Sequence, residues 1–251
     1  MFDAATGCKG WLINKGLAAK KYYVSDVDVS NYSHGCYDSL IFNKVKKILG
    51  GRVRIMITAS APISKDVLEF MKVSFGCPIL EAYGLSETSG AVTVTHWDDP
   101  ISGTVGGPLE HCAFRLKDLP DMDYRITDKP YPRGEICCRS PCITTGYFMR
   151  PDKTSEAIDD EGFLHTGDVG TIMPNGAIKI LDRCKNIFKL SQGEYVAPEK
   201  CENIFVQSNF ISQIMVYGDS LQSCVVAIVV PEKDATAKWA AENGKDVDTI
   251  Y

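Results

Sequence analysis

The sequence predicts an α/β fold with a parallel sheet, followed by a small β-rich part and then by a truncated α+β part. Helical and strand patterns alternate through residues 38–82, which is typical of a parallel sheet whose strands are joined by helices. Residues 111–181 instead contain short strand patterns separated by Gly, Pro and Asp, which indicates a compact β-rich unit. Beyond residue 182 the order is strand, helix, strand, strand and helix.

The α/β part is expected to contain two helices and two strands. Apolar residues recur at helical spacing over residues 38–49, and Gly50-Gly51 ends that helix. A strand over residues 53–58 follows. Ser64 is the expected N-cap of a helix that extends to Phe75, because its hydroxyl can accept a hydrogen bond from the first turn. Residues 77–82 then form a second strand.

The later elements are shorter. We expect strands at residues 113–116, 135–139, 169–173 and 177–181, where apolar residues are bounded by turn residues. A helix then begins at Pro198, strands follow at residues 211–217 and 224–230, and a last helix begins at Glu232. Gly244 is expected to end that helix, because glycine adopts the left-handed backbone of a helix C-terminus easily.

Composition excludes several classes of protein. The chain has 251 residues, and 45% of them are hydrophobic, which is enough for a substantial core. The net charge of -5 argues against nucleic acid as a partner, because phosphate binding needs clustered Lys and Arg. No run approaches the roughly 20 apolar residues of a membrane span. The ten cysteines lack the CxxC pairs of a zinc site, and with no secretory leader ahead of them we expect reduced thiols.

Three short segments contain the residue types of a nucleotide site, namely residues 83–88, 165–168 and 182–194. Tyr83 follows an apolar run and precedes a loop that contains glycine. In such a loop its ring could stack on a base while Ser86 reaches a phosphate. Asp168 has two acceptor oxygens, which can take both hydroxyls of a ribose. Arg183 offers a planar fork suited to phosphate or ribose oxygens.

Each segment also has a plainer interpretation when it is considered alone. Tyr83 could be a half-buried ring at a strand-end turn. Asp168 could bond its own backbone in an Asx-turn. The charges at residues 182–189 could be the solvated surface of a hairpin. Short motifs match by accident, so the joint order of the three segments carries the hypothesis of one nucleotide site.

In combination, the motifs resemble those of the adenylate-forming family, and most of all its eukaryotic long-chain acyl-CoA synthetases. The resemblance covers residues 50–231. The segments that carry it are GGRVR (50–54), ASAP (59–62), EAYGLSE (81–87), GTVGGP (103–108), RGEI (133–136), GYF (146–148), GFLHTGD (162–168), DRCKN (182–186) and KLSQGEYVAPEK (189–200).

The resemblance implies part of a parallel-sheet adenylation domain with a small β-rich subdomain, followed by a truncated α+β C-terminal domain. We therefore expect a partial adenylation subdomain at residues 1–110 and a β-rich subdomain at residues 111–181. A hinge would occupy residues 182–185, and the truncated C-terminal domain would occupy residues 186–251.

The resemblance also implies a role for each matching residue. The adenine would lie between the ring of Tyr83 and the segment Ser60, Ala61 and Pro62, and the nucleotide-binding residues would include Glu81, Ala82 and Gly84. Ser86 and Glu87 would be catalytic, the first touching phosphate and the second holding Mg²⁺. Asp168 would bind the ribose diol and Arg183 the oxygens nearby. The catalytic hinge would contain Lys185, and the residues near the pantetheine of coenzyme A would be Lys189, Gly193 and Glu194.

The implied activity is the ATP-dependent conversion of a long-chain fatty acid to its acyl-CoA through an acyl adenylate, with ATP, Mg²⁺ and coenzyme A. The family's upstream phosphate loop and its distant C-terminal lysine have no counterpart here, so we expect a fragment that binds nucleotide weakly and turns over poorly. Two alternatives stay open, a noncatalytic nucleotide-binding or scaffold derivative and a ligase for a different carboxylic acid. We expect a cytoplasmic location, with peripheral contact at the cytosolic face of a membrane left open.

Overall fold

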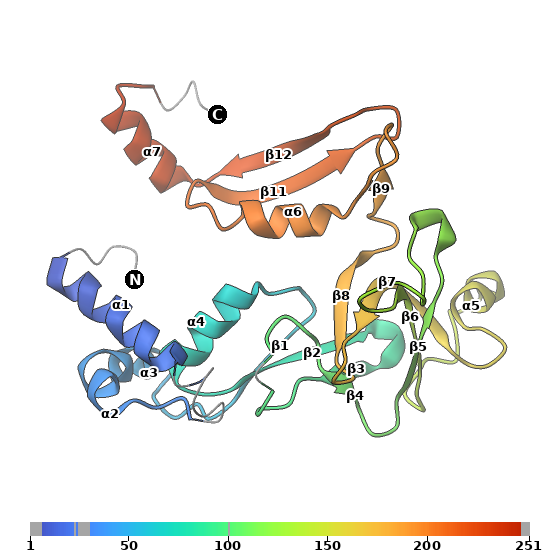
Figure 1. Ribbon diagram of the computed structural model, residues 1–251, viewed down its shortest axis with the longest axis horizontal. Helices are drawn as coiled ribbons and strands as arrows, with labels where there is room; N and C mark the ends of the chain where they lie inside the picture. The colour runs from blue at the N-terminus through green and yellow to red at the C-terminus, as the bar shows by residue number, and fades with distance from the viewer. Residues whose placement is uncertain (1–6, 23, 25–30, 100, 247–251) are drawn as a thin grey trace. The chain divides into compact units, whose positions relative to one another are not determined.

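The computed structural model describes residues 7–22, 24, 31–99 and 101–246 (Figure 1). The chain divides into two compact units. The first comprises the described residues up to Phe114, together with Cys138–Leu164 and Ile172–Lys179. The second comprises Arg115–Cys137, His165–Thr171 and the described residues from Ile180 onward.

The sheet of the first unit has the strand order β1-β2-β3-β4. Its strands are Met56–Ala59 (β1), Ile79–Leu85 (β2), Gly90–Val94 (β3) and Gly107–Pro108 (β4). β1 and β2 run parallel and are joined by helix α4, Lys65–Phe75, so the predicted parallel pairing is confirmed. β3 pairs antiparallel with both β2 and β4, and these two strands were not predicted from the sequence.

Helix α4 begins and ends at the residues that the sequence indicates. The Ser64 hydroxyl accepts a hydrogen bond from the Val67 amide at 3.3 Å, as expected of an N-cap. Gly76 ends the helix with a left-handed φ of 61°. Leu68 and Val73 are only 1% and 2% exposed, so this helix contributes directly to the core.

Several helices of the first unit precede its sheet in sequence. They are α1 (Gly7–Tyr22), α2 (Gly35–Tyr37), the π-helical turn Asp38–Phe42 and α3 (Asn43–Ile48). The predicted helix over residues 38–49 therefore starts as a π-helical turn. Asp38 accepts hydrogen bonds from Lys20 at 2.7 Å and from Lys46 at 3.1 Å. Because Lys20 is only 1% exposed, this pairing is what makes its burial tolerable.

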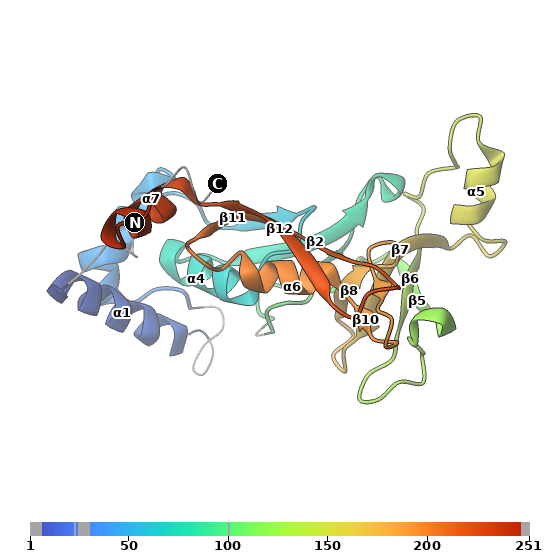
Figure 2. The ribbon, with the colours of Figure 1, turned by 90° about the horizontal axis from the view of Figure 1, so that it is seen from above.

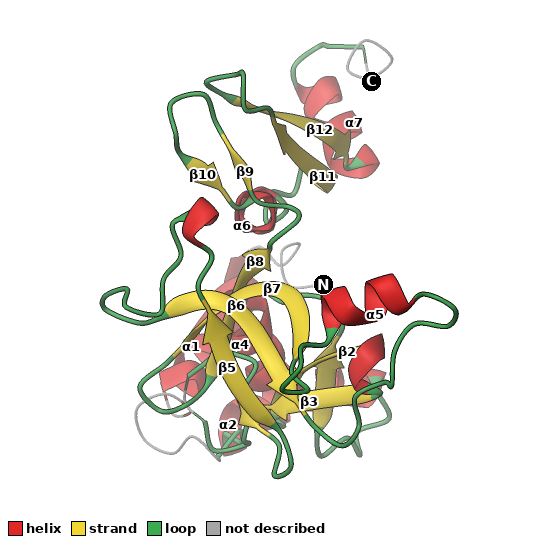
Figure 3. Cartoon of the chain, turned by 90° about the vertical axis from the view of Figure 1, so that its right-hand side faces the viewer, coloured by secondary structure: helices red, strands yellow, loops and turns green. Residues whose placement is uncertain are grey.

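A second four-stranded sheet has the order β5-β6-β7-β8 (Figure 3). Its strands are Ala113–Lys117 (β5), Arg133–Arg139 (β6), Leu164–Ile172 (β7) and Ile178–Arg183 (β8), and helix α5 (Pro151–Ala157) lies between β6 and β7 in sequence. All four strands overlap those predicted from the sequence. β7 begins five residues earlier than expected, so it includes the whole segment from His165 to Asp168.

The described residues after β8 form two antiparallel strand pairs and two helices. The elements are β9 (Phe188–Lys189), β10 (Tyr195–Val196), α6 (Pro198–Phe205), β11 (Ile211–Gly218), β12 (Val225–Pro231) and α7 (Lys233–Glu242). Figure 2 shows α6 running along β11, where Glu202 accepts the Val216 amide hydrogen at 2.7 Å. Every residue of Val225–Val230 in β12 is exposed in this two-stranded arrangement.

The observed elements confirm the predicted α/β class with a β-rich part and a C-terminal α+β part. The expected end of the last helix is also observed, since Gly244 has a left-handed φ of 61° just after α7. None of the described helices is both long enough and apolar enough to cross a bilayer. Nine cysteines in the described part of the chain are free thiols.

Candidate functional site

Two predicted nucleotide-binding segments lie at the same edge of the first sheet. Ala59 in β1 pairs with Ala82 in the parallel strand β2. Ser60, which follows β1, and Tyr83, which lies within β2, are therefore neighbours at the carboxyl end of β1, where open α/β sheets bind ligands. Ser60 has a φ of 74°, which is uncommon for a residue other than glycine. Tyr83 is only 8% exposed. The stacking of its ring on an adenine stays a prediction.

A tight turn follows β2 and carries Ser86 and Glu87. Gly84 has to be glycine because a Cβ there would overlap the carbonyl oxygen of Gly90 in β3. The Thr88 hydroxyl accepts the Leu85 amide hydrogen at 2.8 Å and lies 2.7 Å from the Gly90 oxygen. These contacts fix the turn Ser86–Thr88 and leave Ser86 exposed.

Glu87 is held by the segment that precedes helix α5. Its carbonyl oxygen accepts the Thr144 amide hydrogen at 2.7 Å, and its carboxylate oxygen Oε1 accepts the Tyr147 hydroxyl at 2.6 Å. The hydrogen bond to this carboxylate raises the pKa of the Tyr147 phenol, since it is stronger with the protonated phenol. A partly exposed carboxylate with a fixed orientation is a suitable ligand for a hard cation such as Mg²⁺.

Glu81 lies in β2, two residues before Tyr83, and pairs with Thr58 of β1. The residue is 8% exposed, and its Oε1 accepts the Gly103 amide hydrogen at 3.4 Å. Burial raises the pKa of its carboxyl group. Glu81 therefore links β2 to the loop before β4 inside the first unit, and its predicted contact with a nucleotide stays a prediction.

In the second unit, Asp168 and Arg183 form an ion pair; the resemblance assigns Asp168 to the ribose and Arg183 to the oxygens nearby. Arg183 Nε lies 3.3 Å from Asp168 Oδ1. The Asp168 side chain is 5% exposed, whereas that of Arg183 is 62% exposed. The structure thus brings these two predicted residues together at adjacent strands β7 and β8.

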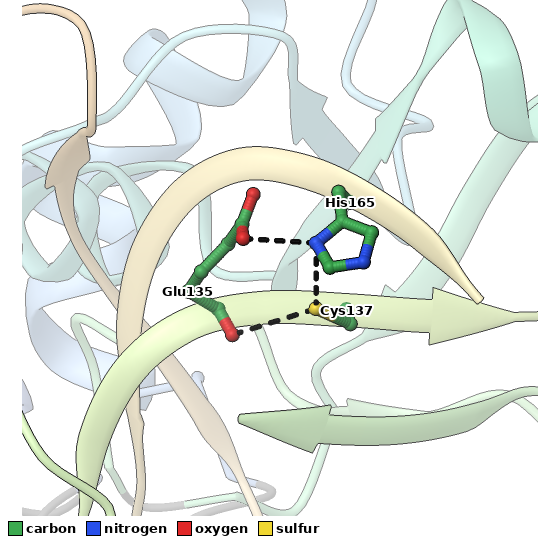
Figure 4. Close-up of side chains that lie close together, drawn as sticks. All are labelled: Glu135, Cys137 and His165. Carbon is green, nitrogen blue, oxygen red and sulfur yellow. Dashed lines mark hydrogen bonds and ion pairs between the residues drawn. The ribbon is translucent and has the colours of Figure 1, made fainter. Parts of the chain in front are cut away.

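Glu135 contacts the predicted ribose segment, and sequence reasoning did not single it out. It belongs to the motif RGEI, to which we assigned no role, and it lies in β6 beside the predicted ribose segment of β7. Its carboxylate contacts His165 Nδ1 at 3.0 Å (Figure 4) and accepts the Gly167 amide hydrogen at 3.2 Å. The signal that could have found it is an acidic residue in a strand whose next three residues are apolar.

Asp182 is a buried acid at the end of β8. It is 1% exposed, and its Oδ1 accepts the Arg183 amide hydrogen at 2.7 Å. Within the described residues, its second oxygen Oδ2 has no hydrogen-bond partner. Burial raises the pKa of the Asp182 carboxyl to about 6, and the nearby charge of Glu199 adds to this effect.

The remaining predicted residues lie after β8 and around the β9–β10 pair. Lys185 is exposed in the turn that follows Arg183. The Lys189 ammonium lies 5.0 Å from the centre of the Tyr195 ring, which is a cation–π contact. Gly193 has a left-handed φ of 94° in the turn that joins the two strands, next to the exposed Glu194. Their predicted roles at the hinge and at coenzyme A stay predictions.

The structure therefore divides the predicted residues between its two units. Those of the sheet edge and the turn after β2 belong to the first unit, and those from Asp168 onward belong to the second. A pocket of ≈ 460 Å³ in the first unit is lined by Val94, His96, Asp98, Asp99, Gly107, Pro108, Asn175, Gly176 and Ala177. None of these residues was predicted to bind nucleotide.

Comparison with known proteins identifies the class. The model of the AMP-binding enzyme family matches residues 19–148, just over half of the chain. The chain therefore belongs to the AMP-binding enzyme family.

Its relatives include enzymes that act on long-chain fatty acids. The chain is 48% identical over 208 residues to the peroxisomal long chain acyl-CoA synthetase 7 of Arabidopsis thaliana, a match that covers 83% of this chain and 30% of that protein. It is 42% identical over 249 residues to the long-chain-fatty-acid–CoA ligase 1 of Homo sapiens, with 97% of this chain and 35% of that protein covered. The chain thus spans about a third of the length of these curated relatives.

A solved structure supports the fold independently. The A domain of the carboxylic acid reductase from Segniliparus rugosus, solved with AMP and a co-purified carboxylic acid, matches with a TM-score of 0.70 and 30% sequence identity. The match covers 92% of this chain and 38% of that one. The fold of this chain is therefore that of part of an adenylate-forming enzyme.

Proposed function

We propose that the protein takes part in the ATP-dependent activation of long-chain fatty acids to acyl-CoA through an acyl-adenylate intermediate. The observation that carries the proposal is the ion pair between the buried Asp168 and Arg183, which belong to two of the motifs that carry the resemblance. Identity of 41–48% to long-chain acyl-CoA synthetases over most of the chain supports the choice of substrate.

In the first half of the proposed reaction, the fatty carboxylate attacks the α-phosphorus of ATP and pyrophosphate leaves. Tyr83 and the segment from Ser60 to Pro62 would bind the adenine, and Asp168 would accept hydrogen bonds from the ribose hydroxyls. Ser86, which is exposed on its turn, would contact a phosphate oxygen.

Glu87 is the residue that would hold a magnesium ion. Its carboxylate fits this role because oxygen donors suit Mg²⁺ and because Thr144 and Tyr147 fix its position. When bound, the ion would offset the phosphate charge that otherwise repels an anionic nucleophile. Glu87 itself contributes an oriented carboxylate that remains accessible to solvent.

In the second half of the proposed reaction, the thiol of coenzyme A attacks the acyl carbonyl and AMP leaves. Lys185 would lie at a hinge that changes the site between the two halves. The turn with Gly193 and Glu194 would approach the pantetheine arm, and Lys189 would contribute positive charge there. We propose that the reaction takes place in the cytoplasm, although the Arabidopsis relative is peroxisomal by name. Cell fractionation followed by detection with an antibody to this chain tests the location.

The experiment that tests the proposal measures AMP binding and then ATP–pyrophosphate exchange with palmitate. We expect the 251-residue protein to bind AMP in a titration calorimeter and to exchange slowly, with both signals lost in Asp168→Ala. AMP binding that is unaffected by this substitution would refute the assigned site. Exchange that occurs with an aryl acid but not with palmitate would favour a second candidate function, a ligase for a different carboxylic acid. The observation that supports this candidate is the 30% sequence identity to the A domain of the carboxylic acid reductase.

A further inference from the structure

The carboxylate of Glu135 reaches across from β6 to contact two residues of β7. Its Oε2 lies 3.0 Å from His165 Nδ1, and its Oε1 accepts the Gly167 amide hydrogen at 3.2 Å. Glu135 is 9% exposed, so both contacts are largely shielded from water. Figure 4 shows the imidazole of His165 directed at this carboxylate.

Thr166, which lies between His165 and Gly167, is also hydrogen-bonded to β6. The Thr166 hydroxyl donates to the Ile136 carbonyl at 2.7 Å and accepts the Asp168 amide hydrogen at 3.1 Å. The Gly167 carbonyl accepts the Cys184 amide hydrogen at 2.8 Å. Each of the four residues from His165 to Asp168 is therefore held by at least one hydrogen bond, and two of these bonds end on one carboxylate.

The backbone at this point needs such support. Gly167 has a φ of 72°, so it interrupts the extended conformation one residue before Asp168. Glycine can adopt many other conformations at similar energy, so its own preference does not fix the bend. The hydrogen bond that the Gly167 amide donates to Glu135 selects one orientation of that peptide, and the direction of the Asp168 side chain follows from it.

We propose that Glu135, together with His165, is a positioning residue for the nucleotide ribose. The pair holds the His165–Asp168 segment in the bent conformation that aims the Asp168 carboxylate at the sugar hydroxyls. Residues that contact a ligand-binding side chain hold that side chain in position. Small displacements of the binding side chain lower the affinity for the ligand. The inference rests on the proposed function, because that function makes Asp168 the ribose ligand.

A metal ion is the competing explanation for the same residues. The ligand atoms of Glu135, Cys137 and His165 all lie within 4.8 Å of one another. Cys137 Sγ lies 3.5 Å from His165 Nδ1 and 3.8 Å from the Glu135 carbonyl oxygen. We assign the proton of His165 to Nδ1, where it donates to Glu135, because this tautomer satisfies both groups; Nδ1 then has no lone pair for a metal.

The test compares AMP with 2′-deoxy-AMP as ligands of the 251-residue protein. In Glu135→Leu, which keeps the bulk but removes both contacts, we expect AMP affinity to fall by on the order of tenfold while 2′-deoxy-AMP affinity changes little. Glu135→Gln can still accept from Gly167 and should stay within about threefold of the parent protein. His165→Asn removes one contact and should lie between them, which keeps the test valid if the Leu variant does not fold.

Asp128→Asn provides the matched control. Asp128 also joins a backbone amide, that of Arg125 at 3.0 Å, to a side chain, Arg133 Nε at 2.8 Å, and neither of these partners lies in β7. Its loss should lower thermal stability and leave the preference for AMP over 2′-deoxy-AMP unchanged. A general loss of stability cannot remove that preference, so the ratio separates positioning from folding.

The outcomes are distinct. A parent protein that fails to bind AMP overturns the proposed function, and the inference falls with it. If the parent protein and Glu135→Leu prefer AMP over 2′-deoxy-AMP to the same extent, the inference about Glu135 is overturned and the proposed function is not. Stoichiometric zinc in the purified protein by plasma mass spectrometry, lost in Cys137→Ala, would also overturn it in favour of a metal site.

Discussion

The two units present their predicted nucleotide carboxylates in opposite ways. Glu87, in the first unit, lies in a turn, is partly exposed, and has its carboxylate bonded by the Tyr147 hydroxyl. Asp168, in the second unit, lies within a strand, is 4% exposed, and follows three residues that are each tied to a neighbouring strand. A cation arrives with its own water shell and needs an accessible ligand. Sugar hydroxyls are better served by an acceptor fixed in advance.

The two units also use glycine for different reasons. Gly84, beside the turn of Glu87, leaves room for the Gly90 carbonyl of the next strand. Gly167, beside Asp168, has open space around it and is needed only for its left-handed φ of 72°. Steric exclusion thus shapes the first region, and backbone conformation shapes the second.

Gly84→Ala should have the largest effect, because the new Cβ overlaps backbone atoms that cannot move independently of the sheet. We expect the free energy of unfolding to fall by about 3 kcal/mol or more. Urea titration of the purified protein measures this. Gly167→Ala is the control, and an equal loss in the two variants would remove the distinction drawn between the glycines.

Asp168→Ala should weaken AMP binding by on the order of 100-fold, since two hydrogen bonds to a charged acceptor are lost. Asp168→Asn keeps one acceptor oxygen and should lose less. Calorimetric titration measures both, with Asp128→Asn as a variant of unchanged affinity. An unchanged AMP affinity in Asp168→Ala would contradict the idea that the second unit holds the sugar.

Asp182→Asn should raise stability at neutral pH. The carboxyl has a pKa of about 6 in the folded protein, above the ordinary value of 3.8, so the folded state binds the proton more tightly. Stability of the parent protein should therefore fall as the pH rises from about 4 to about 6 and then level off. The Asn variant should show a flatter profile and gain about 2 kcal/mol at pH 7 by urea titration. A parent profile that rises over this window would contradict the burial effect.

Gly167→Ala should cost about 1 kcal/mol of unfolding free energy, the strain of a left-handed residue that has a Cβ. The same substitution should reduce AMP affinity, because relaxation of the bend would turn Asp168 away. Stability and affinity are read in parallel. A loss of stability with full affinity would mean that the bend does not aim the carboxylate.

Tyr147→Phe should have the smallest effect. It removes one hydrogen bond to a carboxylate that stays accessible to water, so the unfolding free energy should change by less than about 1 kcal/mol. The magnesium dependence of ATP binding should shift by no more than about threefold. A loss as large as that of Asp168→Ala would show that the first region also depends on a fixed acceptor.

Local patterns predicted much of the fold. The Ser64 cap, the Gly76 end and the parallel pairing of β1 with β2 all follow from residues close together in sequence. Helix α1 was not predicted, because its apolar residues form no stripe along one face. The short strands β3 and β4 were missed because they depend on pairing with β2 more than on their own residues.

The site was predictable only where a motif carries its own chemistry. Asp168 and Arg183 were chosen from their residue types, and the structure places them 3.3 Å apart. The contact of Glu135 with His165 joins residues 30 positions apart, so a local pattern can single out Glu135 as a buried acid but not identify its partner. The burial of Asp182 was likewise hidden, because a charged residue at the end of a strand is usually exposed.

The bare strand β12 has a practical consequence for all these measurements. The run VVAIVV combines high β-propensity with no charge and no proline, and all six side chains face water. Such a strand at a sheet edge is a template for pairing with another molecule. At the protein concentrations used for calorimetry, aggregation through this strand would therefore interfere with the binding measurement. Light scattering across a dilution series identifies the concentrations at which the protein does not aggregate and a binding isotherm is valid.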